Sequence, residues 1–138
     1  RDWSSDVCSS DLETMKVCIL GSRSIDQAEK VIPIIDKFFK DHVSGSPVIL
    51  SGGAKGVDQI TKAYAKANSL HLIEFLPYHL LDKNVEFSSK YFFIRNKQMI
   101  DNADKVLVFW DGKSKGTEYG IKYTQKKGIP IMILKIPI

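Results

Sequence analysis

The chain has 138 residues, of which 43% are hydrophobic and 26% charged, and its formal net charge is +4. This length suits one domain with its own core, and the composition is that of an ordinary globular protein rather than a disordered one. The longest apolar runs have the length of a strand, which argues against a membrane span, and Cys8 and Cys18 provide no disulfide framework.

Residues 1–14 do not share the pattern of the rest of the chain. They contain Ser-Ser-Asp twice and show neither a helical nor a strand period. They resemble a translated sequencing adapter, with a polar extension as the alternative, so we expect the folded domain to comprise residues 15–138. Without their net charge of −3, the formal charge of residues 15–138 is +7. Such an excess suits an anionic ligand or a solvated basic surface.

Short apolar runs then alternate with amphipathic segments. The apolar runs predict strands at 16–20, 48–50, 70–76, 105–110 and 129–136. The amphipathic segments predict helices at 28–42, 57–65, 91–102 and 117–127, and a polar, aromatic-rich passage fills 77–90. Asp26 and Glu29 form a candidate capping box for the first helix, whereas Pro33 inside it predicts a kink or a later start.

This alternation predicts the fold class. Strands composed almost entirely of Val, Ile and Leu are typical of parallel sheets, whose two faces are both covered by helices. We therefore expect an α/β fold, a single Rossmann-like three-layer domain with a five-stranded, mainly parallel sheet.

Three loops that follow predicted strands are rich in glycine and small polar residues: "GSR" at 21–23, "SGGAKG" at 51–56 and "DGKSKGT" at 111–117. In an open parallel sheet, ligands bind beyond the carboxyl ends of the strands. A glycine-rich turn at a helix start offers free N–H groups and the positive end of the helix dipole to a phosphate. The loops therefore predict a site for an anionic, nucleotide-derived ligand. The Rossmann GxGxxG and Walker A patterns are both absent, so the usual dinucleotide and triphosphate sites are not indicated.

These loops, with "RNKQM" at 95–99 and "AD" at 103–104, resemble the YspA-related branch of the SLOG superfamily from about residue 16 to the end. The resemblance implies a Rossmann-like fold that binds nucleotides or nucleotide-derived ligands, in a dimer or tetramer. The superfamily includes the LOG phosphoribohydrolases, which release a base from a nucleoside monophosphate. It also includes DNA-processing protein A, which binds single-stranded DNA, and antiviral sensor domains that bind ADP-ribose-derived signals.

The resemblance implies roles for individual residues. Gly52, Gly53 and Gly56 would line a phosphate cradle, and Arg95 would lie beside the ligand. The candidate ligand-binding residues are Gly21, Ser22, Arg23, Gly52, Gly53, Ala54, Gly56, Asp58, Arg95, Asn96, Trp110, Gly112, Ser114, Gly116, Thr117 and Glu118.

Plainer roles stay open for several of these residues and their neighbours. Arg95 is also able to pair with Asp101 or Asp104, and Asp58 suits the positive end of its helix. Trp110 is a core residue or a stacking platform for a base, and Tyr78 is a weaker platform candidate. Four further residues are interpreted as structural: Phe92, Phe93 and Met99 as packing residues, and Asp111 as a turn residue.

One departure from the LOG pattern bears on catalysis. LOG enzymes have a glutamate two residues after the threonine of their glycine-rich motif, where this chain has Tyr119, with Glu118 one residue earlier. A slip of one residue at a helix start turns a side chain by about 100°. No catalytic residue is therefore assigned, and Arg95 and Glu118 are candidates only for a hydrolase.

We expect a cytoplasmic protein that senses or sequesters a nucleotide-derived molecule, such as an ADP-ribose or cyclic-nucleotide signal, with a viral anti-defence sink as one use. The alternatives are a LOG-like nucleoside-monophosphate phosphoribohydrolase and a single-stranded nucleic-acid-binding protein. No cofactor and no membrane partner are predicted. No metal site is predicted either, because His42, His71 and His79 lack metal-ligand spacing.

Overall fold

A sheet of five strands runs through the centre of the structure, a computed structural model that describes residues 14–137. The strands are β1 (Thr14–Gly21), β2 (Ser46–Ser51), β3 (His71–Glu74), β4 (Lys105–Trp110) and β5 (Ile131–Lys135). Their order is β3-β2-β1-β4-β5, and every neighbouring pair is parallel. The predicted fold class, a Rossmann-like α/β domain with a five-stranded parallel sheet, is confirmed.

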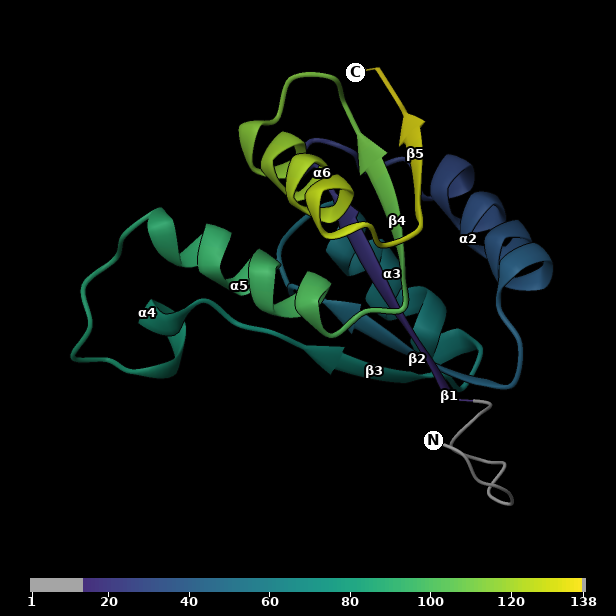
Figure 1. Cartoon of the computed structure of the whole chain (residues 1–138), viewed down its shortest axis with the longest axis horizontal. Coiled ribbons are helices and arrows are strands. Elements are labelled where there is room, and N and C mark those ends of the chain that lie inside the picture. Colours follow the sequence, from purple (N-terminus) through teal and green to yellow (C-terminus); the bar gives the residue numbers. More distant parts are fainter. Residues whose placement is uncertain (1–13, 138) are drawn as a thin grey trace.

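Helices cover both faces of this sheet (Figure 1). They are α2 (Ala28–His42), α3 (Val57–Ala67), α4 (Tyr78–Leu81), α5 (Lys90–Asp101) and α6 (Lys115–Lys127). Successive strand residues point to opposite faces. Val17 and Ile19 of β1 accordingly lie in the core cluster of α2 and α3, and Cys18 and Leu20 lie in the cluster of α5 and α6. No helix within residues 14–137 is long and apolar enough to cross a membrane.

The first helix has its predicted bounds, 28–42, but not its predicted cap. Helix α2 begins at Ala28 after Gln27, and no side-chain hydrogen bond caps it, so the capping box of Asp26 and Glu29 is wrong. The later start is wrong as well, because Pro33 lies inside the helix. The buried stripe of Val31, Ile35 and Phe38 explains this outcome, since tertiary packing supplies most of a helix's stability and outweighs the cost of one proline.

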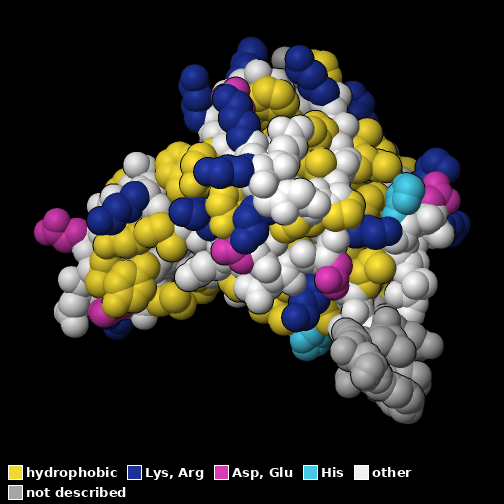
Figure 2. Space-filling view, viewed as in Figure 1, with side chains coloured by type: hydrophobic (Ala, Val, Ile, Leu, Met, Phe, Trp, Pro, Cys, Tyr) yellow, Lys and Arg dark blue, Asp and Glu magenta, His cyan; other side chains and the backbone are white. Residues whose placement is uncertain are grey.

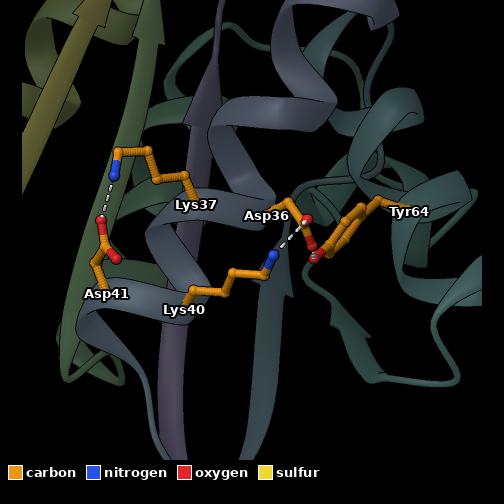
Figure 3. Close-up of polar contacts among 5 residues, drawn as sticks. All are labelled: Asp36, Lys37, Lys40, Asp41 and Tyr64. Carbon is orange, nitrogen blue, oxygen red and sulfur yellow. Dashed lines mark hydrogen bonds and ion pairs between the residues drawn. The ribbon is translucent and has the colours of Figure 1, made fainter.

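Helices α2 and α3 are joined by a hydrogen bond (Figure 3). The Tyr64 hydroxyl of α3 donates to Asp36 Oδ1 of α2 over 2.9 Å. Partial burial, followed by the bond to Asp36, raises the pKa of Tyr64 to about 12, so the phenol stays protonated and able to donate. The Lys37–Asp41 pair beside it, at 2.9 Å, is exposed and contributes little. The Tyr64 bond helps to fix α3, whose first turn faces the site described below.

The remaining boundaries differ from the sequence prediction by a few residues. Strand β1 begins at Thr14, which pairs with Ser46, one residue before the predicted domain start. The tail assigned to residues 1–14 otherwise lies outside the described residues. Strands β3 and β5 are shorter than predicted, and the 77–90 passage contains the short helix α4 and extends to one side of the sheet (Figure 1).

Candidate functional site

A cavity of about 450 Å³ lies at the carboxyl edge of the sheet. The loops after β1, β2 and β4 and one face of α5 form its walls. The strand order changes direction between β1 and β4, and α/β sheets leave a ligand-binding crevice at such a point. The cavity therefore occupies the edge that the three glycine-rich loops indicate.

Ten of the sixteen predicted ligand-binding residues line this cavity: Gly21, Arg23, Gly52, Ala54, Asp58, Arg95, Asn96, Ser114, Gly116 and Thr117. The other six do not line it: Ser22, Gly53, Gly56, Trp110, Gly112 and Glu118. The sequence thus predicts which loops form the cavity, but it does not predict which residues of each loop line it.

Ser22 stabilises the loops from behind. It is buried, its hydroxyl accepts a hydrogen bond from the Asp111 backbone N–H over 3.1 Å, and it lies 3.4 Å from the Thr117 hydroxyl. Trp110 does not line the cavity either, and its indole N–H donates to the Ser114 carbonyl over 3.1 Å. Both residues position the loops after β1 and β4 rather than forming the cavity wall.

A side chain at Gly53 would point away from the cavity. A Cβ atom at this position would lie 3.3 Å from Leu76 and 3.4 Å from Glu74, two residues that do not line the cavity. A larger residue at Gly53 would therefore press on the end of β3 instead of filling the cavity. In this loop, the glycine that faces the cavity is Gly52.

Seven further residues line the cavity that the sequence analysis did not assign to the ligand: Leu20, Ser24, Ser89, Phe92, Phe93, Met99 and Asp111. A signal for part of this set was available. Phe92, Arg95, Asn96 and Met99 have the spacing i, i+3, i+4 and i+7, which places them on one face of a helix. Because Arg95 was a ligand candidate, this spacing pointed to Phe92 as its neighbour in the wall.

Arg95 connects three parts of the site. Its side chain is buried, with 6% exposed, and its Nη1 donates to the carbonyls of Gly52 (2.5 Å) and Phe75 (3.2 Å). Its Nε donates to Asn96 Oδ1 over 2.9 Å. Burial lowers the pKa of Arg95, although an arginine remains protonated in proteins. The guanidinium therefore holds the loops after β2 and β3 against α5 and adds a positive charge to the cavity wall.

The alternative pairing of Arg95 with Asp101 or Asp104 is wrong. Asp101 forms an ion pair with Lys127 at 3.2 Å, and Asp104 accepts a hydrogen bond from the Lys16 backbone N–H over 2.9 Å. Arg95 instead turns inward, because its hydrogen-bond acceptors are backbone carbonyls at the ends of β2 and β3.

Asp58 is the buried carboxylate of the site. It lies in the first turn of α3, is 7% exposed, and its Oδ2 accepts a hydrogen bond from the Ala54 N–H over 3.0 Å. Burial raises the pKa of Asp58, against the opposing effects of the Ala54 bond and the Arg95 charge. Asp58 therefore holds its own loop in place and lines the cavity, and its contact with a ligand stays a prediction.

The raised pKa of Asp58 predicts a pH-dependent stability. The stabilisation from its protonated form is complete below the unfolded-state value of 3.8 and is lost as pH rises through the folded-state pKa. We expect wild type to lose stability relative to Asp58→Asn as pH rises from this value to neutrality, because asparagine keeps the acceptor without the charge. Urea unfolding of both proteins across this range measures the difference. A wild type that gains stability relative to the variant would contradict the prediction.

The loop after β4 is organised by Asp111 and Ser114. Asp111 Oδ1 accepts the backbone N–H groups of Lys113 and Ser114, each over 2.8 Å, and Oδ2 accepts the Ser24 hydroxyl over 2.5 Å. The bond from Ser24, followed by those backbone bonds, lowers the pKa of Asp111 to about 2. Ser114 is the N-cap of α6, and its hydroxyl accepts the Thr117 N–H over 3.4 Å. The amino end of α6 therefore faces the cavity, where a helix favours an anion.

The residues around the LOG glutamate position lie outside the cavity. Glu118 forms an exposed ion pair with Lys122 at 3.4 Å. The Tyr119 ring packs edge-on against Phe93, with ring centroids 4.8 Å apart. Among residues 14–137, the carboxylates that line the cavity are Asp58 and Asp111, and each already accepts hydrogen bonds from its own loop.

Comparisons with known proteins bear on the family and the fold of the chain. Residues 15–79 match the family described as "YspA, cpYpsA-related SLOG family". Among curated proteins, none is significantly similar to the chain in sequence.

Solved structures share the fold. DNA processing protein A from Streptococcus pneumoniae aligns with a TM-score of 0.71 and 20% identity over 92% of this chain and 52% of that one. DNA processing protein A from Helicobacter pylori, which has a single-stranded DNA binding mode, gives a TM-score of 0.68 and 23% identity over 90% of this chain and 66% of that one. The structure named TM1055 gives 0.60 and 18% identity over 85% and 72%. The chain thus spans about half to two thirds of the length of the two DNA processing proteins.

Proposed function

The resemblance of this chain to the YspA-related branch of the SLOG superfamily is confirmed, and on that premise we propose that it binds a phosphate-bearing, nucleotide-derived small molecule in the cavity. The observation that carries the proposal is the meeting of the amino end of α6 with Arg23 and Arg95 around one cavity. Two arginines and free helical N–H groups favour an anionic group.

The rest of the cavity supports the nucleotide part of the proposal. Phe92 and Phe93 line the same space and offer aromatic faces on which a base stacks. Arg23 lies over the Phe92 ring at 4.7 Å from its centroid, and no described residue accepts a hydrogen bond from its guanidinium. Asp58 offers an acceptor for a hydroxyl or amino group. ADP-ribose-derived and cyclic-nucleotide signals carry all three kinds of group.

We propose binding rather than turnover. Cleavage of a glycosidic bond requires a carboxylate close to the reacting sugar and water. Glu118 faces Lys122 outside the cavity, and the two carboxylates that line it, Asp58 and Asp111, already accept hydrogen bonds within their own loops. The proposal includes a homo-oligomer in the cytoplasm that senses or sequesters its ligand, with anti-defence sequestration as one use.

Calorimetry with ADP-ribose, cyclic nucleotides and nucleoside monophosphates tests the proposal. We expect at least one of them to bind and to be recovered intact by chromatography after incubation. Gly116→Val is expected to weaken that binding at least tenfold, the equivalent of about 1.4 kcal/mol. A Cβ at Gly116 meets no atom within 4 Å, so valine fills part of the cavity without disturbing the fold.

Two results would contradict this prediction. Equal binding by Gly116→Val would mean that the amino end of α6 is only a turn. Release of free base over many turnovers, abolished in Glu118→Gln, would make the protein a LOG-like phosphoribohydrolase.

Single-stranded nucleic acid is the second candidate ligand, and the surface of α5 and α6 favours it. The Lys97 and Lys127 ammonium groups lie 5.6 Å and 5.9 Å from the centroid of the Tyr123 ring, which gives a basic surface with an aromatic side chain. Single-strand affinity falls by about 0.7 log unit per neutralised phosphate for each tenfold rise in salt. A steep slope with oligonucleotides, without small-molecule binding, would favour this candidate over the first.

A further inference from the structure

The charged side chains that line the ligand cavity are balanced in sign. Among residues 14–137 they are two cations, Arg23 and Arg95, and two carboxylates, Asp58 and Asp111. The domain from residue 15 has a formal charge of +7, and Figure 2 shows Lys and Arg side chains spread over the face that α5 and α6 form in Figure 1. None of the lysines of residues 14–137 lines the cavity. Because salt screens exposed charges over about 10 Å, a bound phosphate meets mainly the four residues of the cavity wall.

The charge of Arg95 is compensated within the protein. Its Nη1 donates to the carbonyls of Gly52 and Phe75, so this part of the guanidinium is already occupied. Asp58 lies on the same side of Gly52, because a Cβ atom there would lie 2.5 Å from Arg95 Nη1 and 3.1 Å from Asp58 Oδ2. Both charged side chains are buried, and opposite charges attract more strongly where solvent is excluded. A phosphate that approaches Arg95 therefore meets the Asp58 carboxylate as well.

A second carboxylate lies at the helix end that faces the cavity. Asp111 Oδ1 accepts the N–H of Ser114, the N-cap of α6, over 2.8 Å. The bond from Ser24, followed by the backbone bonds, lowers the pKa of Asp111 to about 2, so the carboxylate is ionised at neutral pH. Its charge offsets the amino end of α6, which carries roughly half a unit of positive charge. Arg23 remains as the cation for a ligand, since its described contact is with the Phe92 ring, 4.7 Å from the centroid.

We propose that the cavity selects a phosphate group that carries one negative charge, as in a phosphodiester, over a terminal phosphate monoester. The single uncompensated guanidinium of the described cavity wall balances one negative charge. A monoester carries about 1.5 to 2 negative charges at pH 7, and the excess would lie near Asp58 and Asp111 without a cation of its own. Cyclic nucleotides and the internal phosphates of ADP-ribose belong to the selected class, whereas nucleoside monophosphates do not. The inference rests on the proposed nucleotide binding and names its ligand class.

Calorimetry at about pH 8 with two adenosine ligands of matched size tests the selection. At this pH the phosphate of AMP, whose second pKa is about 6, carries two negative charges. Adenosine 5′-fluorophosphate has fluorine in place of one phosphate oxygen and carries one. We expect wild type to bind the fluorophosphate at least about tenfold more tightly than AMP, because like charges placed together in a binding site are strongly unfavourable. We also expect 3′,5′-cyclic AMP, a diester, to bind more tightly than AMP.

Asp58→Asn tests whether the carboxylates of the cavity wall cause the selection. Asparagine keeps an acceptor for the Ala54 N–H and removes the charge. We expect the affinity for AMP to rise and the preference for the fluorophosphate to narrow severalfold. Glu118→Gln is the matched control, because it removes the same charge near the start of α6, but Glu118 pairs with Lys122 and does not line the cavity. This variant should keep the wild-type preference, and urea unfolding checks that both variants are folded.

Three results would overturn the proposal. AMP that binds wild type as tightly as the fluorophosphate does, or more tightly, would remove the selection and leave nucleotide binding intact. A folded Asp58→Asn variant with the same preference as Glu118→Gln would show that the charge of the cavity wall does not set the selection. If none of the three adenosine ligands binds, the charge selection fails, whereas the proposed nucleotide binding is decided by the wider ligand panel. The two failures are therefore distinguishable.

Discussion

Replacement of Arg95 by methionine is expected to lower the free energy of unfolding by about 2–4 kcal/mol, since hydrogen bonds to charged groups contribute roughly 1.5–3 kcal/mol each. The variant loses the bonds to the Gly52 and Phe75 carbonyls, which join the ends of β2 and β3 to α5. Methionine keeps much of the apolar length of the side chain, so the loss reports on the guanidinium. Urea unfolding measures the stability, and calorimetry with the ligand found in the panel should show no binding.

Arg23→Met is the matched control for this variant. Arg23 lines the same cavity, but it is exposed and its described contact is with the face of Phe92. Cation–π contacts at exposed sites contribute about 0.5–1 kcal/mol, so stability should change by no more than this. Ligand binding should still weaken, because one of two positive charges is lost. If Arg95→Met unfolds no more easily than Arg23→Met, the structural role assigned to Arg95 is wrong.

Gly56→Ala is expected to destabilise the protein by at least about 3 kcal/mol, combining backbone strain at a positive φ with a clash, which are among the mechanisms behind large mutational effects. Gly56 has φ of +71° and ψ of −124°, a sparsely populated backbone conformation outside the left-handed helical region that costs a residue with a Cβ atom about 1–3 kcal/mol. Its Cβ would also lie 2.6 Å from the Arg23 carbonyl oxygen and 2.7 Å from that of Ser22. Relief of this contact moves the loop after β1 away from α3 and displaces Arg23 at the cavity.

Gly128→Ala is the control for a positive φ without a clash. Gly128 ends α6 in the left-handed helical conformation, with φ of +74° and ψ of 22°, and a Cβ there meets no atom within 4 Å. We expect this variant to lose only the 1–2 kcal/mol of backbone strain and to bind ligand like wild type. Thermal unfolding and calorimetry of the two variants provide the comparison. If Gly56→Ala and Gly128→Ala destabilise the protein equally, the close approach of the loops after β1 and β2 does not contribute to the effect of Gly56→Ala.

The three glycines to which the resemblance gives one role, lining a phosphate cradle, have different environments in the structure. Three glycines in "SGGAKG" are equivalent in a sequence motif, because each lacks a side chain. In the folded loop they differ: Gly52 faces the cavity, Gly53 faces the end of β3, and Gly56 lies against the loop after β1. Only the path of the backbone, set by packing, separates these three environments.

The class of the fold and the edge of the sheet that carries the cavity follow from the local pattern of the amino-acid sequence. Strand-length runs of Val, Ile and Leu, alternating with helical periods, leave a parallel sheet as the arrangement that buries both faces. Parallel strands bring their carboxyl ends to one edge, so the loops after β1, β2 and β4 had to converge. Local sequence patterns are sufficient to predict these two features, because the hydrophobic period of a segment and the order of strands and helices can both be read from short stretches of sequence.

Tertiary structure alone decided the direction of individual side chains. On sequence grounds Trp110 was a ligand-binding candidate and Phe92 a packing residue, yet the indole of Trp110 donates to the Ser114 carbonyl and Phe92 lines the cavity. Arg95 turned inward because the carbonyls of Gly52 and Phe75, distant in sequence, come together beside α5. A buried polar group takes whichever partner the fold brings within hydrogen-bond distance. That partner is set by contacts between distant segments, which no local pattern contains.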